Sequence, residues 1–256
     1  MIPLRDVNPV GRHPYVTVGL ILANAALFFY ELSLGPQGLE AFLMDSAFVP
    51  ARMFGDGAGG LGFATTSIAL SMFLHGGWLH FLGNMLFLWV FGDNIEDELG
   101  HVRYLVFYLA AGYAAALVHA FANPASALPA IGASGAIAGV LGAYLLLHPK
   151  APIVTLIFLG FFITTTRVPA IVYLPIWFLI QVFSGVASVG ARTAAETGGV
   201  AWFAHIGGFV AGPLLVFLLR PRGGRRRPPP AVRAPGRTLA DDRRGRYRTE
   251  ARPRRL

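Results

Sequence analysis

Long apolar runs alternate with short polar, glycine- or proline-containing segments along most of the chain. A helix that crosses a bilayer needs about 20 mostly apolar residues. Six runs approach or reach this length: residues 15–34, 77–91 extended backwards through 71–76, 102–121, 131–147, 168–188 and 200–219. The apolar stretch 153–163 is too short to span, so we expect a connector near the membrane surface. The pattern predicts an all-α fold, a polytopic membrane helix bundle with six transmembrane helices.

Composition supports a membrane protein, and the charge needs to be divided before it is interpreted. Hydrophobic residues make up 55% and charged residues 13%, about half the charged share of a soluble domain, and the mean hydropathy is +0.57. The net charge of +8 would favour nucleic acid, but fourteen Arg and three acids in residues 220–256 contribute +11, which leaves −3 for residues 1–219. We therefore expect a membrane domain over 15–219 and a disordered Arg/Pro-rich tail over 220–256.

The basic residues also predict the orientation of the chain. Cytoplasmic loops carry an excess of Lys and Arg near the ends of spans. One side of a six-span arrangement collects most of them: Arg5, Arg12, Lys150, Arg167 and the tail. The segment 1–14 and the tail should therefore be cytoplasmic. Only one aromatic residue, Tyr247, lies among the tail's charges, so we expect anionic lipid rather than nucleic acid as its partner.

Four polar residues lie inside predicted spans, where polar groups are costly and usually face a cavity or a partner. His80 and Asn84 are four residues apart and so share one face of the second span. Ser134 lies near the start of the fourth span, and His205 near the start of the sixth. Because all three spans run from outside to inside, the four side chains can share the outer part of the bilayer.

Small-residue spacing predicts that the fourth and sixth spans touch. Gly135 and Gly139 form one small-xxx-small pair, and Gly208 and Gly212 form another. Such faces let helix backbones approach closely in lipid. A close contact here would bring Ser134 beside His205.

The chemistry that this allows is nucleophilic catalysis. A serine hydroxyl attacks only when a neighbouring base takes its proton, and His205 is a suitable base for Ser134. Asn84, His80 and the Ser134 N–H could donate to a developing oxyanion. No intramembrane acid is placed to orient the histidine, so we expect a Ser-His dyad. The chain has no cysteine and no H-E-x-x-H pattern, so we expect no metal and no cofactor.

Plainer interpretations of these residues stay open. An isolated serine in a span usually bonds its own helix carbonyl, and an isolated histidine near a span end usually packs or lies at the interface. A small transporter is another possibility, but it would favour internal repeats and intramembrane charge. The sequence has no evident repeat, and Glu31 is the only acid near the interior of a span.

The motifs together resemble the rhomboid family of intramembrane serine proteases. FLHGGWLHFLGN at 73–84, FGDNIED at 91–97, GASG at 132–135 and HIGG at 205–208 followed by Gly212 follow the family's order, so the resemblance covers about 73–212. It implies a nucleophile at Ser134, a base at His205 and an oxyanion hole from Asn84 and His80. It also implies packing glycines around the site: Gly132, Gly135, Gly208 and Gly212.

The resemblance further implies a bacterial-type, six-helix enzyme of the cell membrane that cleaves transmembrane protein substrates, with its site towards the external side. A non-catalytic relative that binds transmembrane segments is the alternative. Two family features are missing. The first external loop, about 35–66 and expected to be partly embedded, has no Trp-Arg pair, and Ala138 stands where some members carry a tyrosine that stacks on the histidine. The sequence does not indicate what holds His205 instead, nor the oligomeric state.

Overall fold

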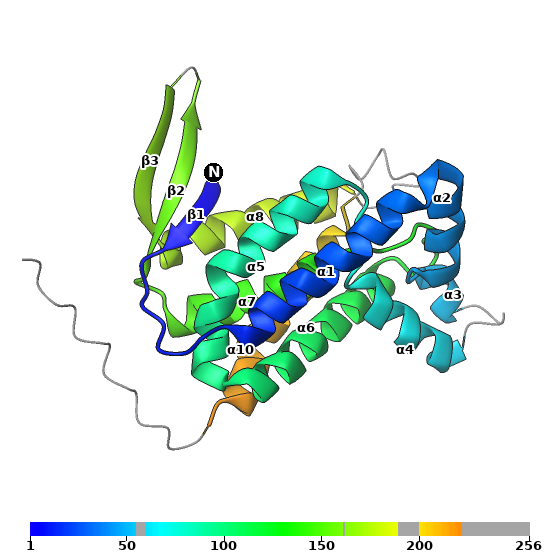
Figure 1. The fold of residues 1–256 in the computed structure, drawn as a ribbon, viewed down its shortest axis with the longest axis horizontal. Helices are drawn as coiled ribbons and strands as arrows, with labels where there is room; N and C mark the ends of the chain where they lie inside the picture. The colour runs from blue at the N-terminus through cyan, green and yellow to red at the C-terminus, as the bar shows by residue number, and fades with distance from the viewer. Residues whose placement is uncertain (55–59, 161, 189–199, 222–256) are drawn as a thin grey trace, which may run out of the picture. The chain divides into compact units, whose positions relative to one another are not determined.

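The structure is a computed structural model that describes residues 1–54, 60–160, 162–188 and 200–221 (Figure 1). The tail expected to be disordered, from residue 222 onwards, and residues 189–199 of the last inter-span loop lie outside the described residues. Helices follow all six apolar runs: α1 (Tyr15–Ser33), α5 (Trp78–Leu99), α6 (His101–Ala122), α7 (Ser134–Leu147), α8 (Ala170–Ala187) and α10 (Trp202–Leu219). The expected helical membrane bundle is confirmed.

Within the described part of the chain, four helices are long and apolar enough to cross a bilayer: α1, α6, α8 and α10. Helix α7 is apolar but has 14 residues, and α5 carries acidic residues near its C-terminal end. That the chain crosses the membrane six times therefore stays a prediction. Helices dominate because lipid offers no hydrogen bonds, so backbone N–H and C=O groups must pair within each segment.

Helices α7 and α10 meet through glycines. A Cβ atom on Gly208 would lie 2.0 Å from the Gly135 carbonyl oxygen, and one on Gly212 would lie 2.0 Å from the Gly139 carbonyl oxygen. Neither position can carry a side chain at this separation. The missing side chains let the two backbones approach, as small-residue faces do in membranes.

Helix α5 differs from the predicted second span at both ends. Residues 71–76 are not part of it, because the chain turns before Gly77, whose φ is +152°. At the other end, residues 92–99, which lie beyond the predicted span, continue the helix until Gly100, whose φ of +76° ends it.

The C-terminal end of α5 is hydrogen-bonded to the first turn of α1. Glu96 is fully buried, and its Oε2 accepts hydrogen bonds from the Thr17 N–H (2.8 Å) and the Thr17 hydroxyl (2.7 Å). Its Oε1 accepts from the Val16 N–H (2.9 Å) and lies 2.6 Å from Nδ1 of His101. The first N–H groups of a helix have no partner within it, so Glu96 supplies the acceptors that α1 lacks.

The expected connector at 153–163 is a β-hairpin, which the all-α prediction missed. Strands β2 (Pro152–Leu159) and β3 (Phe162–Pro169) pair antiparallel, and β1 (Ile2–Asp6) adds to β2 from the chain's start. Figure 1 shows this sheet at the end of the bundle where α1 begins. The segment is rich in Val, Ile, Thr and Phe, which favour strands, and its pairing with β1 depends on residues 150 positions away.

The segment between α1 and α5, which covers the first external loop of the prediction, folds as three short helices at the opposite end of α1: α2 (Gly35–Ser46), α3 (Pro50–Phe54) and α4 (Gly60–Ser71). Buried Phe48 ties this segment to the chain before α7. The Phe48 N–H donates to Oγ of Ser71 (2.7 Å), and the Ala130 N–H donates to the Phe48 carbonyl (2.8 Å). The segment therefore supports the turn that leads to Ser134.

Candidate active site

Ser134 is the first residue of α7, directly after a tight turn. Gly132 has φ +118°, and its N–H donates to the Ser71 carbonyl (2.8 Å). A Cβ atom on Gly132 would lie 2.6 Å from Nε2 of His80. Glycine is therefore needed here for both the backbone conformation and the close approach of His80. The turn places Ser134 at a helix N-terminus, where backbone N–H groups lack partners within the helix.

His205 lies beside Ser134 from the first turn of α10. Its Nε2 is 2.8 Å from the Ser134 Oγ, and the histidine is 9% exposed. The glycine contacts between α7 and α10 set this approach, because Gly208 lies one turn after His205 and Gly135 directly follows Ser134. The structure thus brings together the two residues that the sequence proposed as nucleophile and base.

The other ring nitrogen of His205 has a partner that the sequence analysis missed. Nδ1 lies 2.8 Å from Oε1 of Gln181 on α8, which is 5% exposed. The ring of Trp177, one turn before Gln181, lies 5.9 Å from the His205 ring at 32°, and the Trp202 ring lies 6.1 Å away edge-on. The available signal was a polar residue inside the fifth predicted span, four residues after a tryptophan.

His80 and Asn84 approach Gly132 from α5, as the sequence expected from their spacing. A Cβ atom on Gly132 would lie 3.6 Å from Asn84 Nδ2 as well as 2.6 Å from His80 Nε2. The Gly76 N–H donates to Nδ1 of His80 (3.4 Å), so a neutral ring carries its proton on Nε2, the atom facing Gly132. Asn84 Nδ2 is buried and has no hydrogen-bond partner among the described residues. Both side chains therefore offer a donor beside Gly132, two residues before Ser134.

Glu31 is linked to His80 through His75, which contacts both residues. The two oxygens of this buried carboxylate accept the His75 N–H at 3.1 and 3.2 Å. The His75 ring lies 5.2 Å from the His80 ring in an edge-on arrangement. The acid that the sequence placed near the interior of the first span thus contacts the segment leading to His80 and makes no contact with His205.

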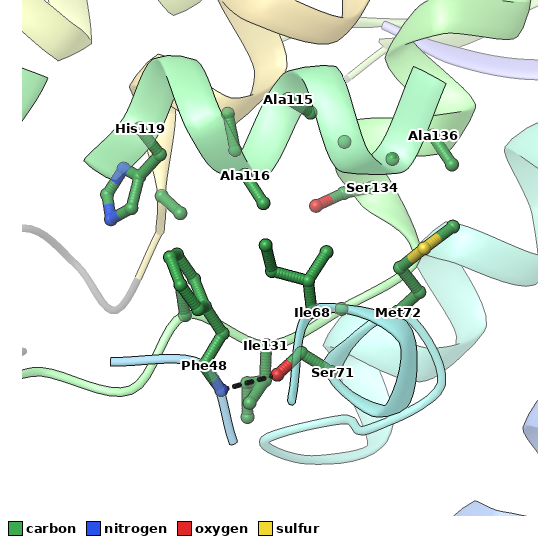
Figure 2. Close-up of a pocket in the computed structure, with 16 residues that line it drawn as sticks. Phe48, Ile68, Ser71, Met72, Ala115, Ala116, His119, Ile131, Ser134 and Ala136 are labelled. Carbon is green, nitrogen blue, oxygen red and sulfur yellow. Dashed lines mark hydrogen bonds between the residues drawn. The ribbon is translucent and has the colours of Figure 1, made fainter. Parts of the chain in front are cut away.

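A small cavity of about 40 Å³ lies beside Ser134, whose hydroxyl points into it (Figure 2). Short side chains of α6 and α10 form much of the wall, among them Ala115, Ala116 and Ala204. His119 lies at one side, and its Nδ1 is buried without a partner among the described residues. The volume is enough for a water molecule, and the histidine offers it a polar contact.

Comparisons of the sequence with known proteins identify the family. A family model described as the Rhomboid domain matches residues 63–222, which is more than half of the chain. The chain belongs to the rhomboid family. The match covers α5 to α10 and so includes every residue of the site described above, except Glu31 on α1.

Several curated rhomboid relatives are similar over part of their length. "RHOMBOID-like protein 4" of Arabidopsis thaliana is 35% identical over 153 residues, which is 59% of this chain and 34% of that protein. "Rhomboid protein 1, mitochondrial" of Saccharomyces cerevisiae is 32% identical over 58% of this chain and 40% of its own length. "Rhomboid protease GluP" of Bacillus subtilis is 43% identical over 28% of this chain and 14% of its own length. The chain thus spans less than half of the length of these relatives.

Two features of this rhomboid site differ from the pattern that the resemblance implied. Ala138 is fully buried and lies against Gly208, where a Cβ atom would be 3.3 Å from that of Ala138. The aromatic ring that lies beside His205 comes from Trp177 on α8. Among the described residues, the site therefore draws on α5, α6, α7, α8 and α10, with Ser71 of α4 and Glu31 of α1 supporting it.

Proposed function

We propose that this rhomboid protein is an intramembrane serine endopeptidase that cleaves transmembrane segments of other membrane proteins. The observation that carries the proposal is the 2.8 Å separation between the Ser134 Oγ and the His205 Nε2. This is the hydrogen-bond distance that a serine nucleophile and its general base require. Ser134 is the nucleophile and His205 the base.

The oxyanion hole is the second element of the proposal. When Ser134 attacks a peptide carbonyl, negative charge develops on the carbonyl oxygen. His80 Nε2–H, Asn84 Nδ2–H and the Ser134 N–H are the donors for it. The unpartnered Nδ2 of Asn84 supports this assignment, because its N–H is free to donate to a developing oxyanion without giving up another hydrogen bond.

The reaction then follows acyl transfer. Ser134 forms a bond to the carbonyl carbon while His205 takes the hydroxyl proton. The tetrahedral intermediate collapses, the C–N bond breaks, and His205 returns the proton to the leaving amine. Water, deprotonated by His205, then attacks the acyl-enzyme. The bond between the acyl carbon and the Ser134 Oγ breaks, His205 returns the proton to Oγ, and the new carboxyl group leaves. No ATP, metal or cofactor enters any step.

The cavity beside Ser134 supports a substrate with a small side chain at the cleaved bond, because its volume is only about 40 Å³. The partners proposed are transmembrane protein substrates in a lipid bilayer. The N-terminal segment and the chain after α10 are placed on the cytoplasmic side, because basic residues cluster there, and the site faces the external side.

The test is cleavage of a panel of transmembrane substrates in proteoliposomes by the wild type, Ser134→Ala and His205→Ala. We expect cleavage by the wild type alone, with circular dichroism and gel filtration showing that both variants remain folded. Retained cleavage in Ser134→Ala contradicts the mechanism.

Labelling by a fluorophosphonate probe separates this enzyme from a rhomboid-like protein that only binds transmembrane segments. An activated serine reacts, so the wild type should be labelled at Ser134 and the His205→Ala variant should not. A wild type that stays unlabelled while it binds transmembrane peptides favours the binding function.

A further inference from the structure

We propose that Gln181 is a positioning residue that fixes His205 in the tautomer able to act as a base, so that the site is a Ser134–His205–Gln181 triad. The inference rests on the proposed proteolytic function, which by itself needs only the serine and the histidine. Gln181 comes from α8, whereas Ser134 and His205 come from α7 and α10. The three side chains form one hydrogen-bonded row.

A backbone carbonyl decides which way the Gln181 amide points. The amide Nε2 lies 3.1 Å from the Trp177 carbonyl oxygen, one helical turn earlier. A carbonyl oxygen can only accept, so the NH₂ group must face Trp177. The amide oxygen Oε1 therefore faces the other way, towards Nδ1 of His205 at 2.8 Å.

The direction of the amide then decides the tautomer of His205. Because Oε1 of Gln181 can only accept, Nδ1 of His205 must carry a proton. A neutral imidazole has one N–H, so Nε2 keeps its lone pair, and this lone pair faces the Ser134 hydroxyl at 2.8 Å. In the opposite tautomer, an N–H would face Ser134 and the ring could not take its proton.

Water has little room to replace Gln181. The glutamine is 5% exposed and His205 is 9% exposed, and the rings of Trp177 and Trp202 flank the histidine. Removal of the amide would leave the Nδ1–H buried without an acceptor, which favours rotation of the ring or a switch of tautomer. The role is that of the asparagine in Cys-His-Asn proteases, which orients the base without carrying charge.

Kinetics can separate positioning from simple packing. Gln181→Leu keeps the size of the side chain and removes the acceptor. We expect kcat to fall about 10- to 100-fold, the range for loss of a partner that orients a histidine, with KM within about twofold. Gln181→Glu should retain most of kcat and move the acid limb of the pH profile to higher pH, because a carboxylate stabilises the imidazolium. His80 and His119, the other titratable groups near His205, are unchanged in both variants.

Phe178→Leu is the matched control. Phe178 stacks on Phe209 with ring centroids 4.5 Å apart. Its replacement by leucine therefore loosens the same α8–α10 interface but does not change Gln181 or His205. We expect this variant to keep kcat and the pH profile. If Phe178→Leu and Gln181→Leu lose kcat equally, and Gln181→Glu does not move the acid limb, Gln181 acts only in packing and the proposal is wrong.

A second measurement does not depend on substrate. ¹⁵N chemical shifts of the histidine rings distinguish N–H from unprotonated nitrogen, and loss of one signal pair in His205→Gln assigns His205. The wild type should show a proton on Nδ1, and Gln181→Leu should show the Nε2–H tautomer. A wild type with the proton on Nε2 overturns the proposal. A wild type with the proton on Nδ1 that cleaves no substrate supports the positioning and counts against proteolysis.

Discussion

The buried polar side chains at the two ends of α5 differ in whether they have hydrogen-bond partners. Near the start of the helix, Asn84 directs a buried amide nitrogen towards Gly132, without a partner among the described residues. Near its end, Glu96 is also buried, but its oxygens accept bonds from Val16, Thr17 and His101. One helix thus carries both the donor that we propose for the oxyanion and a group that is already satisfied.

The contrast extends beyond α5. At the site end, His119 and His75 also keep one buried ring nitrogen each without a partner among the described residues. At the other end, Arg220 donates to Glu98 (2.6 Å), and Asp6 accepts from Tyr144 and Asn94. An unsatisfied donor beside Ser134 is available to a transition state, whereas satisfied groups stabilise the folded state. Activity and stability should therefore be separable by position along the helices.

The largest expected effect is on activity alone. Ser134→Ala, His205→Ala and the double variant should each lose about 10⁴- to 10⁶-fold in kcat, because residues that act as a unit are not additive. The free energy of unfolding in mixed micelles should stay within about 0.5 kcal/mol of wild type, since the site's polar bond is not what holds the helices. A double variant much slower than either single variant would show that the two residues do not act as one unit.

The next effect tests the unsatisfied donor. Asn84→Ala should lower kcat about 10²- to 10³-fold, as loss of one oxyanion donor does, and leave stability unchanged or raised. Asn94→Ala is the matched control on the same helix, because Asn94 is also buried but bonded to Asp6 and Asp93. It should lower stability and leave kcat alone. If both variants change the same quantity, the contrast between the two ends of α5 fails.

The third effect tests the satisfied carboxylate. Glu96→Ala removes the acceptors for the first turn of α1 and should lower the free energy of unfolding by about 1.5–3 kcal/mol. Glu96→Gln keeps one acceptor oxygen and should lose less. Steady-state SDS unfolding monitored by tryptophan fluorescence gives the stability, and kcat per folded molecule should be that of the wild type. A fall in kcat without a fall in stability would place Glu96 with the site.

Much of the helical framework could be predicted because lipid restricts the chain to helices. The first predicted span, 15–34, differs from α1 by one residue, and 102–121 differs from α6 by one residue at each end. The hairpin of β2 and β3 was missed because it lies outside these spans. The third strand of the sheet comes from residues 2–6, far away in the sequence. Apolar length alone could not distinguish it from a connector.

The sequence predicted the four central polar residues of the candidate site. It did not predict the residue that contacts His205 from the other side. Ser134, His205, His80 and Asn84 stand out as polar residues in apolar spans, and short motifs mark them. Gln181 satisfies the same criterion in the fifth span, but no motif marks it, and its role depends on how α8 packs on α10. Likewise, which face of α8 meets His205 is a property of packing, and spacing along one helix does not determine it.

The smallest expected effect concerns Asp6, which ties β1 to the bundle outside the spans. Burial raises the pKa of its carboxyl above the ordinary value, against the hydrogen bonds from Tyr144 and Asn94, which lower it. The folded protein therefore binds this proton more tightly than the unfolded chain does. The stabilising contribution is complete below the ordinary pKa of about 3.9 and is lost as the pH rises through the folded value.

Asp6→Asn, which is neutral and keeps an acceptor oxygen, should flatten this part of the stability profile and be at least as stable as wild type at pH 7. Asp6→Ala should flatten it too but lose stability, because Tyr144 and Asn94 lose their acceptor. A wild-type profile that rises with pH where Asp6→Asn is flat would reverse the sign and show that the charged carboxylate, not the neutral acid, holds β1.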